Sequence, residues 1–269
     1  MDKAVILARG LGSRMRKESS DAQVSDEQSE IAATGLKAMI PIDRPFLDYV
    51  LHNLANVGYR QVCLVIGPEH KQVREYYTET ISPSRIEVVF AIQEEPKGTA
   101  DAVLAAEAFA RNDYILVINS DNYYPLEALQ GLRKLSRSGL AAFEVEGMSA
   151  GSNIAADRIT KFAAIKSDEA GYMSEIIEKP EQQVLDSLPK PVCISMNCWR
   201  FGPAIFEGCK SIELSARGEL ELPDAVAYTM AHLGERYYAL TIKAPVLDLS
   251  SRDDIAPVVE RLKGSEVNL

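Results

Sequence analysis

The chain has 269 residues, of which 46% are hydrophobic and 25% charged, and its formal net charge is −10 at pH 7. The length and composition allow a globular protein with one sizeable core. The acidic balance argues against DNA or RNA as a partner, because a nucleic acid polymer is bound through an excess of lysine and arginine. No apolar run approaches the roughly 20 residues that span a membrane, and the start lacks the pattern of a secretory signal. We therefore expect a cytoplasmic protein with neither a membrane nor a nucleic acid polymer as partner.

The first predicted element is a strand at residues 3–8, a short aliphatic run that is typical of a buried strand. It ends at Arg9-Gly10-Leu11-Gly12-Ser13-Arg14-Met15-Arg16, which offers glycines, a hydroxyl and arginines. Backbone N–H groups at glycines and guanidinium groups are donors that suit phosphate. The turn has neither the third glycine of a dinucleotide fingerprint nor the Gly-Lys-Ser/Thr of a P-loop. A purely structural connection between strand and helix is therefore the alternative.

The next part of the chain alternates between strands and helices. Residues 17–34 are polar and acidic, and we expect a mobile or partly helical flap there. Strands are then predicted at residues 61–66, 86–92, 114–118 and 140–145, and helices at 45–57, 68–77, 99–110 and 126–137. This alternation predicts an α/β fold with a mainly parallel sheet that is covered by helices on both faces.

A binding site is expected at one edge of this sheet, because ligands of such sheets bind beyond the carboxyl ends of the strands. The turn at residues 9–16, the loop at 93–99 and the loop at 119–123 each follow a predicted strand. These three segments are therefore predicted to meet.

The pattern changes after Gly147. A hairpin is predicted with strands at 159–165 and 172–177, followed by Glu178-Lys179-Pro180, a short helix and a strand at 192–201. A helix at 221–233, a strand at 236–243, a short apolar segment at 246–249 and a helix at 254–262 complete the chain. We expect one domain with two lobes around one cleft, formed by residues 1–145 and 146–269.

The cysteines and histidines suggest no metal or nucleophile chemistry. The four cysteines, at positions 63, 193, 198 and 209, form no Cys-x-x-Cys pair and have no histidine at the spacing of a zinc site. We expect buried, reduced thiols. Only three histidines are present, which disfavours histidine-based catalysis.

Five motifs follow one another in the order found in one enzyme family, and together they cover most of the chain. They are Leu7-Ala8-Arg9-Gly10-Leu11-Gly12-Ser13-Arg14-Met15 with Lys37 after a loop, Gln93-x-x-Pro96-x-Gly98-Thr99-Ala100, Ser120-Asp121-Asn122, Glu178-Lys179-Pro180, and Asp248. With this ordered set the chain resembles the sugar-1-phosphate nucleotidyltransferases. That family includes glucose-1-phosphate thymidylyl-, uridylyl- and cytidylyltransferases and mannose-1-phosphate guanylyltransferase.

The resemblance implies a three-layer, Rossmann-like α/β fold with a mixed, mainly parallel sheet and a smaller lobe that binds the sugar phosphate. It implies a reaction in which a sugar 1-phosphate oxygen attacks the α-phosphorus of a nucleoside triphosphate in line and pyrophosphate leaves, with Mg²⁺ as cofactor. The first choice of substrates is dTTP with glucose 1-phosphate, while guanylyl, uridylyl and cytidylyl transfer stay open, as does a homo-oligomeric state. No second acetyltransferase activity is expected.

The same resemblance assigns roles to residues. Arg14, Lys37 and Asp121 are the expected catalytic residues, and Asp121 and Asp248 the expected Mg²⁺ ligands. The residues expected to bind the nucleotide are Leu7, Ala8, Arg9, Gly10, Gly12, Ser13, Gln93, Gly98 and Thr99. The sugar phosphate is expected to contact Asn122, Glu178, Lys179 and Asn197.

Five residues depart from the family pattern. Arg9 replaces a small residue next to the nucleotide, adding a cation that clamps a phosphate or fills space for the base, and Leu36 replaces a proline. Ser250-Ser251 stand where Gly-Thr is expected, and Trp199 stands where many relatives have glycine. A structural aromatic in the core is the alternative for Trp199.

Two other functions stay open. A glycosyltransferase that uses nucleotide sugars shares the layered architecture, but it normally shows Asp-x-Asp, and Ser120-Asp121-Asn122-Tyr123 lacks the second aspartate. A non-catalytic sensor of nucleotide sugars is the other alternative. It has no need of an arginine for the leaving group, so the presence of Arg14 disfavours it.

Overall fold

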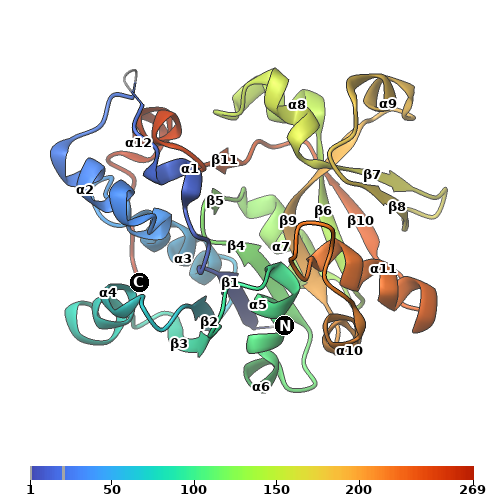
Figure 1. The fold of residues 1–269 in the computed structure, drawn as a ribbon, viewed down its shortest axis with the longest axis horizontal. Helices are drawn as coiled ribbons and strands as arrows, with labels where there is room; N and C mark the ends of the chain where they lie inside the picture. The colour runs from blue at the N-terminus through green and yellow to red at the C-terminus, as the bar shows by residue number, and fades with distance from the viewer. Residues whose placement is uncertain (1, 20–21) are drawn as a thin grey trace.

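A nine-stranded sheet runs through the computed structural model, which describes residues 2–19 and 22–269 (Figure 1). Its main path is β10-β6-β9-β4-β1-β2-β3, and the hairpin β7-β8 attaches through β9. The strands are β1 (Lys3–Leu7), β2 (Gln61–Ile66), β3 (Glu87–Ile92), β4 (Ile115–Asn119), β6 (Gly139–Glu144), β7 (Ala163–Ser167), β8 (Met173–Ile177), β9 (Cys193–Phe201) and β10 (Tyr238–Ile242). A separate two-stranded ribbon pairs β5 (Asn122–Tyr123) with β11 (Leu247–Asp248).

Strand direction in the main sheet agrees with the predicted mixed, mainly parallel α/β fold. The pairs β4-β1, β1-β2, β2-β3 and β10-β6 are parallel. Only β9 and the β7-β8 hairpin introduce antiparallel neighbours. Because β1 to β4 all point the same way, the segments that follow them emerge at one edge of the sheet.

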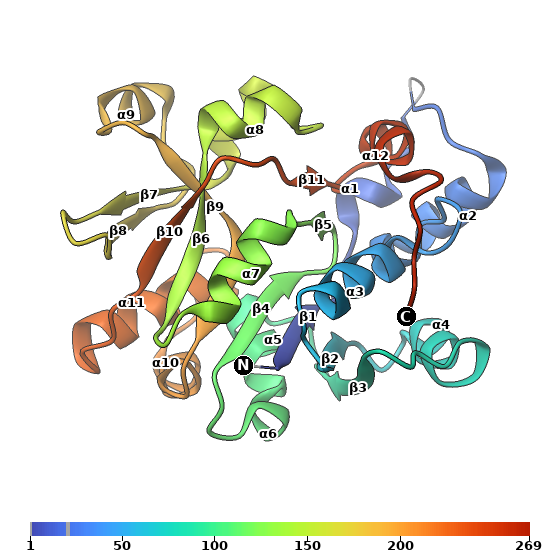
Figure 2. The ribbon, with the colours of Figure 1, turned by 180° about the vertical axis from the view of Figure 1, so that it is seen from behind.

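Helices cover both faces of the sheet (Figures 1 and 2). One core cluster joins the sheet to α3 (Phe46–Asn56), α7 (Leu126–Lys134) and α12 (Ile255–Leu262), and the other joins it to α5 (Thr99–Ala105), α10 (Ala204–Ser211) and α11 (Leu222–His232). Successive residues of β1 divide between them, since Ala4 and Ile6 belong to the first cluster and Val5 to the second. Alternate side chains of a strand point to opposite faces, so a strand covered on both sides is apolar throughout.

The remaining helices are short and connect these layers. They are α1 (Ser13–Arg16), α2 (Asp26–Thr34), η1 (Lys37–Met39), α4 (Lys71–Glu75), η2 (Tyr76–Thr80), α6 (Glu107–Ala110), α8 (Val145–Gly151), η3 (Ala156–Lys161), α9 (Gln182–Ser187) and η4 (Arg252–Asp254). Helix α2 gives the predicted flap an ordered part, while residues 20 and 21 of that flap lie outside the described residues. No helix in the described ranges is long and apolar enough to cross a membrane. All four cysteines are buried, as predicted.

Three features of the second half differ from the predicted elements. The predicted strand at residues 159–165 is wrong in its first part, because Ala156–Lys161 forms a 3-10 helix and only Ala163–Ser167 is extended. Helices α8 and α10 were not predicted from the sequence. In α8, Gly147 and Gly151 face the backbone of Lys243 and the ring of Pro245. Close packing there requires glycine, so a tertiary contact overrides the low helix propensity of this residue.

Candidate active site

A cavity of about 400 Å³ opens at the carboxyl edge of the sheet, which is large enough for a small organic ligand. It is bounded by the turn after β1, residues 35–38, the loop after β3 and the residues after β4. All nine residues predicted to bind the nucleotide and all three predicted catalytic residues line it. The structure thus brings together residues from three of the five motifs, as the sheet topology predicts.

The turn after β1 is held by glycine. Gly12 has φ +60°, and a Cβ there would lie 2.5 Å from the Cα of Gly35. Both the positive φ and the close contact with Gly35 therefore require glycine at position 12. Arg16 donates two hydrogen bonds to the carbonyl of Thr34, which fastens α1 to the end of α2. Arg14 remains exposed at the cavity wall.

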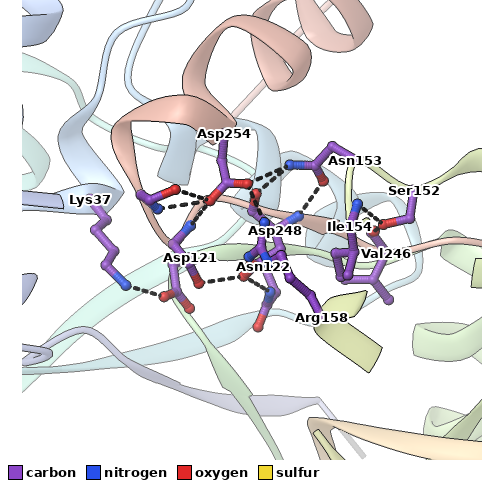
Figure 3. A network of polar contacts seen from close by, with 12 residues as sticks. Lys37, Asp121, Asn122, Ser152, Asn153, Ile154, Arg158, Val246, Asp248 and Asp254 are labelled. Carbon is purple, nitrogen blue, oxygen red and sulfur yellow. Dashed lines mark hydrogen bonds and ion pairs between the residues drawn. The ribbon is translucent and has the colours of Figure 1, made fainter. Parts of the chain in front are cut away.

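Lys37 and Asp121 meet in the cavity (Figure 3). The lysine Nζ lies 2.7 Å from the Asp121 Oδ2, and their side chains are 15% and 21% exposed. Lys37 comes from η1 and Asp121 follows β4. The backbone carbonyl of Asp121 accepts a hydrogen bond from the Leu249 N–H at 2.8 Å. This bond ties the segment after β11 to the predicted catalytic aspartate.

Asp248 lies behind Asp121 and is buried (Figure 3). Its Oδ1 accepts hydrogen bonds from Asn122 Nδ2 at 3.0 Å and Ser250 Oγ at 2.9 Å, while its Oδ2 pairs with Arg158. Arg158 also pairs with Asp254 at 2.6 Å. Burial, followed by the negative charges of Asp121 and Asp254, raises the pKa of Asp248 above its ordinary value. Three carboxylates and two cations thus form one electrostatic group.

The carboxylates fit the predicted Mg²⁺ site unequally. Mg²⁺ is usually held by one or two carboxylates together with substrate phosphates and water. Asp121 lines the cavity and suits this role, whereas both oxygens of Asp248 already accept hydrogen bonds from protein groups. The described residues contain no group of three or more metal-ligating side chains. Of the two predicted Mg²⁺ ligands, Asp121 is therefore the one that lines the cavity, whereas Asp248 is held by Arg158.

Gln93 lies at the other end of the cavity and is held in one orientation. Its side-chain Nε2 donates to the Gly98 carbonyl at 3.0 Å and to Asp101 Oδ2 at 2.7 Å. Both hydrogens of the amide are thereby used, and the reverse orientation would set the amide oxygen against two acceptors. The acceptor Oε1 is left for a ligand.

Gly98 sets the shape of the loop that contains Gln93. It has φ +121°, and a Cβ there would lie 2.8 Å from the backbone N of Leu220. Leu220 exchanges backbone hydrogen bonds with Lys97 and Ala100. The loop after β3 is thus docked on a segment from the second half of the chain.

Arg9, which departs from the family pattern, is buried at the cavity wall. Its side chain is 7% exposed, and its Nη2 lies 3.4 Å from both carboxylate oxygens of Glu69. Its Nε and Nη1 have no hydrogen-bond partner among the described residues. Buried N–H groups of a guanidinium that lack an acceptor are unusual in a folded protein.

The residues predicted to contact the sugar phosphate do not line this cavity. Asn122 is buried against Asp248, and Glu178 and Lys179 are exposed beyond the cavity. Lys179 and Asn197 have positive φ angles of 43° and 54°. Such a backbone is uncommon outside glycine and is often retained at functional sites.

A charged segment before α11 was missed by the sequence reasoning. Glu219 lines the cavity, and Arg217 pairs with Glu221. The pKa of Glu178 is raised, first by desolvation and then by the charge of Glu221, so Glu178 lies close to this segment. The sequence signal was present, because Arg217-Gly218-Glu219-Leu220-Glu221 is a dense run of charge directly before a predicted helix. Trp199 is fully buried and stacks on Phe201, which agrees with the alternative of a core aromatic.

Comparisons with known proteins agree with this description. A family model described as nucleotidyl transferase matches residues 3–255. The UTP–glucose-1-phosphate uridylyltransferase AglF of Haloferax volcanii is 26% identical over 264 residues, which are 97% of this chain and 96% of that protein. A glucose-1-phosphate thymidylyltransferase of Streptomyces antibioticus is 26% identical over 230 residues, which are 84% of this chain and 56% of that protein. The chain spans only about half the length of several other curated relatives.

Solved structures show the same architecture. A UTP-bound UGPase from Acinetobacter baumannii superposes with a TM-score of 0.74 at 17% identity. The match covers 99% of this chain and 95% of that one. At this level of identity the likeness establishes the fold.

Proposed function

Because the chain belongs to the nucleotidyl transferase family, we propose that it joins a nucleoside triphosphate to a sugar 1-phosphate and releases pyrophosphate. The observation that carries this proposal is the shared cavity, in which Arg14, Lys37 and Asp121 face the same space as Gln93. The cavity has cations and a carboxylate at one end and a fixed amide acceptor at the other. A nucleotide has phosphates and a base in the same arrangement.

The reaction consists of one in-line substitution. A phosphate oxygen of the sugar 1-phosphate forms a bond to the α-phosphorus, and the bond to the oxygen bridging the α- and β-phosphates breaks with its electron pair on pyrophosphate. Arg14 and Lys37 stabilise the negative charge that accumulates on the leaving group. Asp121 orients Lys37 and would hold Mg²⁺, which supplies further charge neutralisation when bound. Because the reaction needs no covalent enzyme intermediate, no nucleophilic side chain is required.

The substrates we favour are UTP or dTTP with glucose 1-phosphate. The motifs point first to dTTP, and AglF, a relative that matches nearly the whole chain, is named for UTP. The free acceptor of Gln93 suits the N3–H group of uracil or thymine, whereas neutral cytosine carries no hydrogen on N3. The geometry therefore favours the two bases that share this imide over cytosine.

The sugar phosphate would approach from the second half, residues 146–269. Lys179 would bind its phosphate, and Glu178 and Asn197 would form hydrogen bonds with sugar hydroxyls. Asn122 would contribute indirectly, because its side chain donates a hydrogen bond to Asp248. Residues 1–145 would bind the nucleotide.

The proposal is tested by measuring pyrophosphate release from the purified full chain. UTP, dTTP, CTP, GTP and ATP are each supplied with Mg²⁺, with and without glucose 1-phosphate. We expect release with UTP or dTTP that depends on the sugar phosphate and yields the corresponding nucleotide sugar. Binding of nucleotide sugars without turnover of any of the five triphosphates would instead favour a sensor, and transfer of sugar from a nucleotide sugar to an acceptor would favour a glycosyltransferase.

A further inference from the structure

The side chain of Arg9 lies on the base side of the cavity. The strand order β4-β1-β2-β3 places β1, and therefore Arg9, between two groups of functional residues. Asp121 follows β4 on one side, whereas Glu69 follows β2 and Gln93 follows β3 on the other. Because the Arg9 guanidinium contacts Glu69, it is directed to the β2-β3 side of β1, from which Gln93 comes, and not to the side of Asp121.

The guanidinium is poorly satisfied in this position. Charge-assisted N–H···O bonds usually measure about 2.7–2.9 Å, whereas both contacts from Arg9 to Glu69 are 3.4 Å long. The N–H groups on Nε and Nη1 are buried and have no acceptor among the described residues. The Glu69 side chain is 52% exposed, so it is a weak and easily exchanged partner.

The Gln93 amide itself supplies no donor at the base end of the cavity. Uracil and thymine present an N–H between two carbonyl oxygens, so full recognition needs one acceptor and at least one donor. Gln93 offers the acceptor only, because Gly98 and Asp101 take both of its amide hydrogens. Arginine is a donor without acceptor capacity, which is the complement that Gln93 leaves open.

We propose that Arg9 selects the base of the nucleotide by donating to the O4 carbonyl oxygen of uracil or thymine, where cytosine has an amino group. On binding, its guanidinium exchanges the long contact with Glu69 for this oxygen, beside the N–H that Gln93 accepts. The inference rests on the proposed function and adds a specificity residue to it. A contact with the phosphates is less favoured, because Asp121 and its partner Lys37 lie on the β4 side of β1.

The test compares Arg9→Met with the wild-type chain. Methionine keeps much of the buried volume and removes every donor. We expect kcat/KM for UTP and dTTP to fall by about 10- to 100-fold, as the loss of a charge-assisted hydrogen bond implies. The kcat/KM for CTP and the KM for glucose 1-phosphate should change by less than about threefold. Lys71→Ala, which removes an exposed cation from the helix after Glu69, should behave as wild type.

Three outcomes would overturn the inference. Unchanged kcat/KM for UTP and dTTP in Arg9→Met means that the donors are not used. If the preference for UTP and dTTP over CTP is retained in Arg9→Met but lost in Arg9→Ala, Arg9 acts only by filling space. If kcat/KM falls equally for UTP and CTP, and inhibition by inorganic pyrophosphate weakens by the same factor, Arg9 contacts phosphate.

The experiment also separates this inference from the proposed function. If the wild-type chain releases no pyrophosphate with any triphosphate, the proposed function fails. Calorimetric binding of UTP then still tests Arg9. A Kd that rises at least tenfold in Arg9→Met, with no comparable change for CTP, supports the inference. An equal Kd, or no UTP binding by the wild-type chain, overturns it.

Discussion

The Lys37 Nζ lies 2.7 Å from the Asp121 Oδ2, so the principal cation and the accessible carboxylate of the cavity neutralise each other before any ligand is present. The pair joins a short 3-10 helix to the end of β4, two segments 84 residues apart. On the proposed function, an arriving triphosphate would compete with Asp121 for Lys37, and an arriving cation would compete with Lys37 for Asp121. The pair would then exchange its internal contact for both charges.

Asp121→Asn should reduce activity far more than stability. The amide keeps a hydrogen bond to Lys37 and loses the negative charge that orients it, so we expect kcat to fall by about 10²- to 10³-fold. The bond from the Leu249 N–H survives, because it reaches the backbone carbonyl of residue 121. Steady-state kinetics and thermal unfolding check this. An equal loss in the exposed control Asp157→Asn would contradict it.

Gly12→Ala should destabilise the protein, while Gly10→Ala should not. A Cβ on Gly12 meets the Gly35 backbone at a positive φ, whereas a Cβ on Gly10 has nothing within 4 Å. We expect the first substitution to lower the free energy of unfolding by about 1–3 kcal/mol and the second to change it by less than about 0.5 kcal/mol. Denaturant unfolding of the two variants gives the comparison. Equal values would show that the turn is not constrained as described.

Lys179→Gly should separate stability from function. Glycine relieves the positive φ of 43°, so the free energy of unfolding should stay equal or rise by about 0.5–1 kcal/mol. Loss of the ammonium should raise the KM for sugar phosphate by about tenfold and leave the KM for the triphosphate unchanged. Lys190→Ala removes an exposed lysine of the same half and serves as control. An unchanged KM for sugar phosphate would remove Lys179 from the site.

Arg158→Ala should make the protein more sensitive to magnesium. Removing the guanidinium leaves Asp248 and Asp254 without their cation, which should lower the free energy of unfolding by roughly 3 kcal/mol. A bound divalent ion stabilises the folded state. Millimolar Mg²⁺ should therefore raise the Tm of this variant more than that of the wild type. An equal shift in both would show that Asp248 does not come within reach of the ion.

His70 should make stability depend on pH near neutrality. Burial, aided by the charges of Arg9 and Arg16 and opposed by Glu69, lowers the pKa of His70 from 6.5. The unfolded chain therefore binds a proton that the folded chain does not, and stability falls as pH drops below about 6.5. His70→Gln keeps a hydrogen-bond acceptor for the Gly67 N–H and should lose this dependence. Unfolding of both proteins from pH 8 to pH 5 measures the difference.

Much of the sheet and of the nucleotide half of the cavity could be predicted from the sequence. Parallel strands buried on both faces have a continuous apolar pattern, and the residues after them must emerge at one edge. The turn at residues 9–16 and the loop at 93–99 were found in this way, because each comes after a strand. Their motifs are local, so short-range order is enough to identify them.

The features that could not be predicted depend on contacts between segments that are far apart in the sequence. Arg158 meets Asp248 across 90 residues, and no local pattern distinguishes it from a solvated arginine. The 3-10 conformation around it displaced a predicted strand for the same reason. The left-handed backbone of Lys179 is likewise imposed by tertiary structure, since lysine does not favour it. Charge density before α11 was the one local signal left unused.

The order of strands in the main sheet also bears on how the chain is made. Strand β9 lies between β6 and β4, although it is synthesised last of the three. Until residue 201 has left the ribosome, both earlier strands keep an open edge, and open edges promote association between chains. If the gene is split near residue 145, each fragment should therefore aggregate when it is produced alone. The fragments should be soluble only when both are produced together.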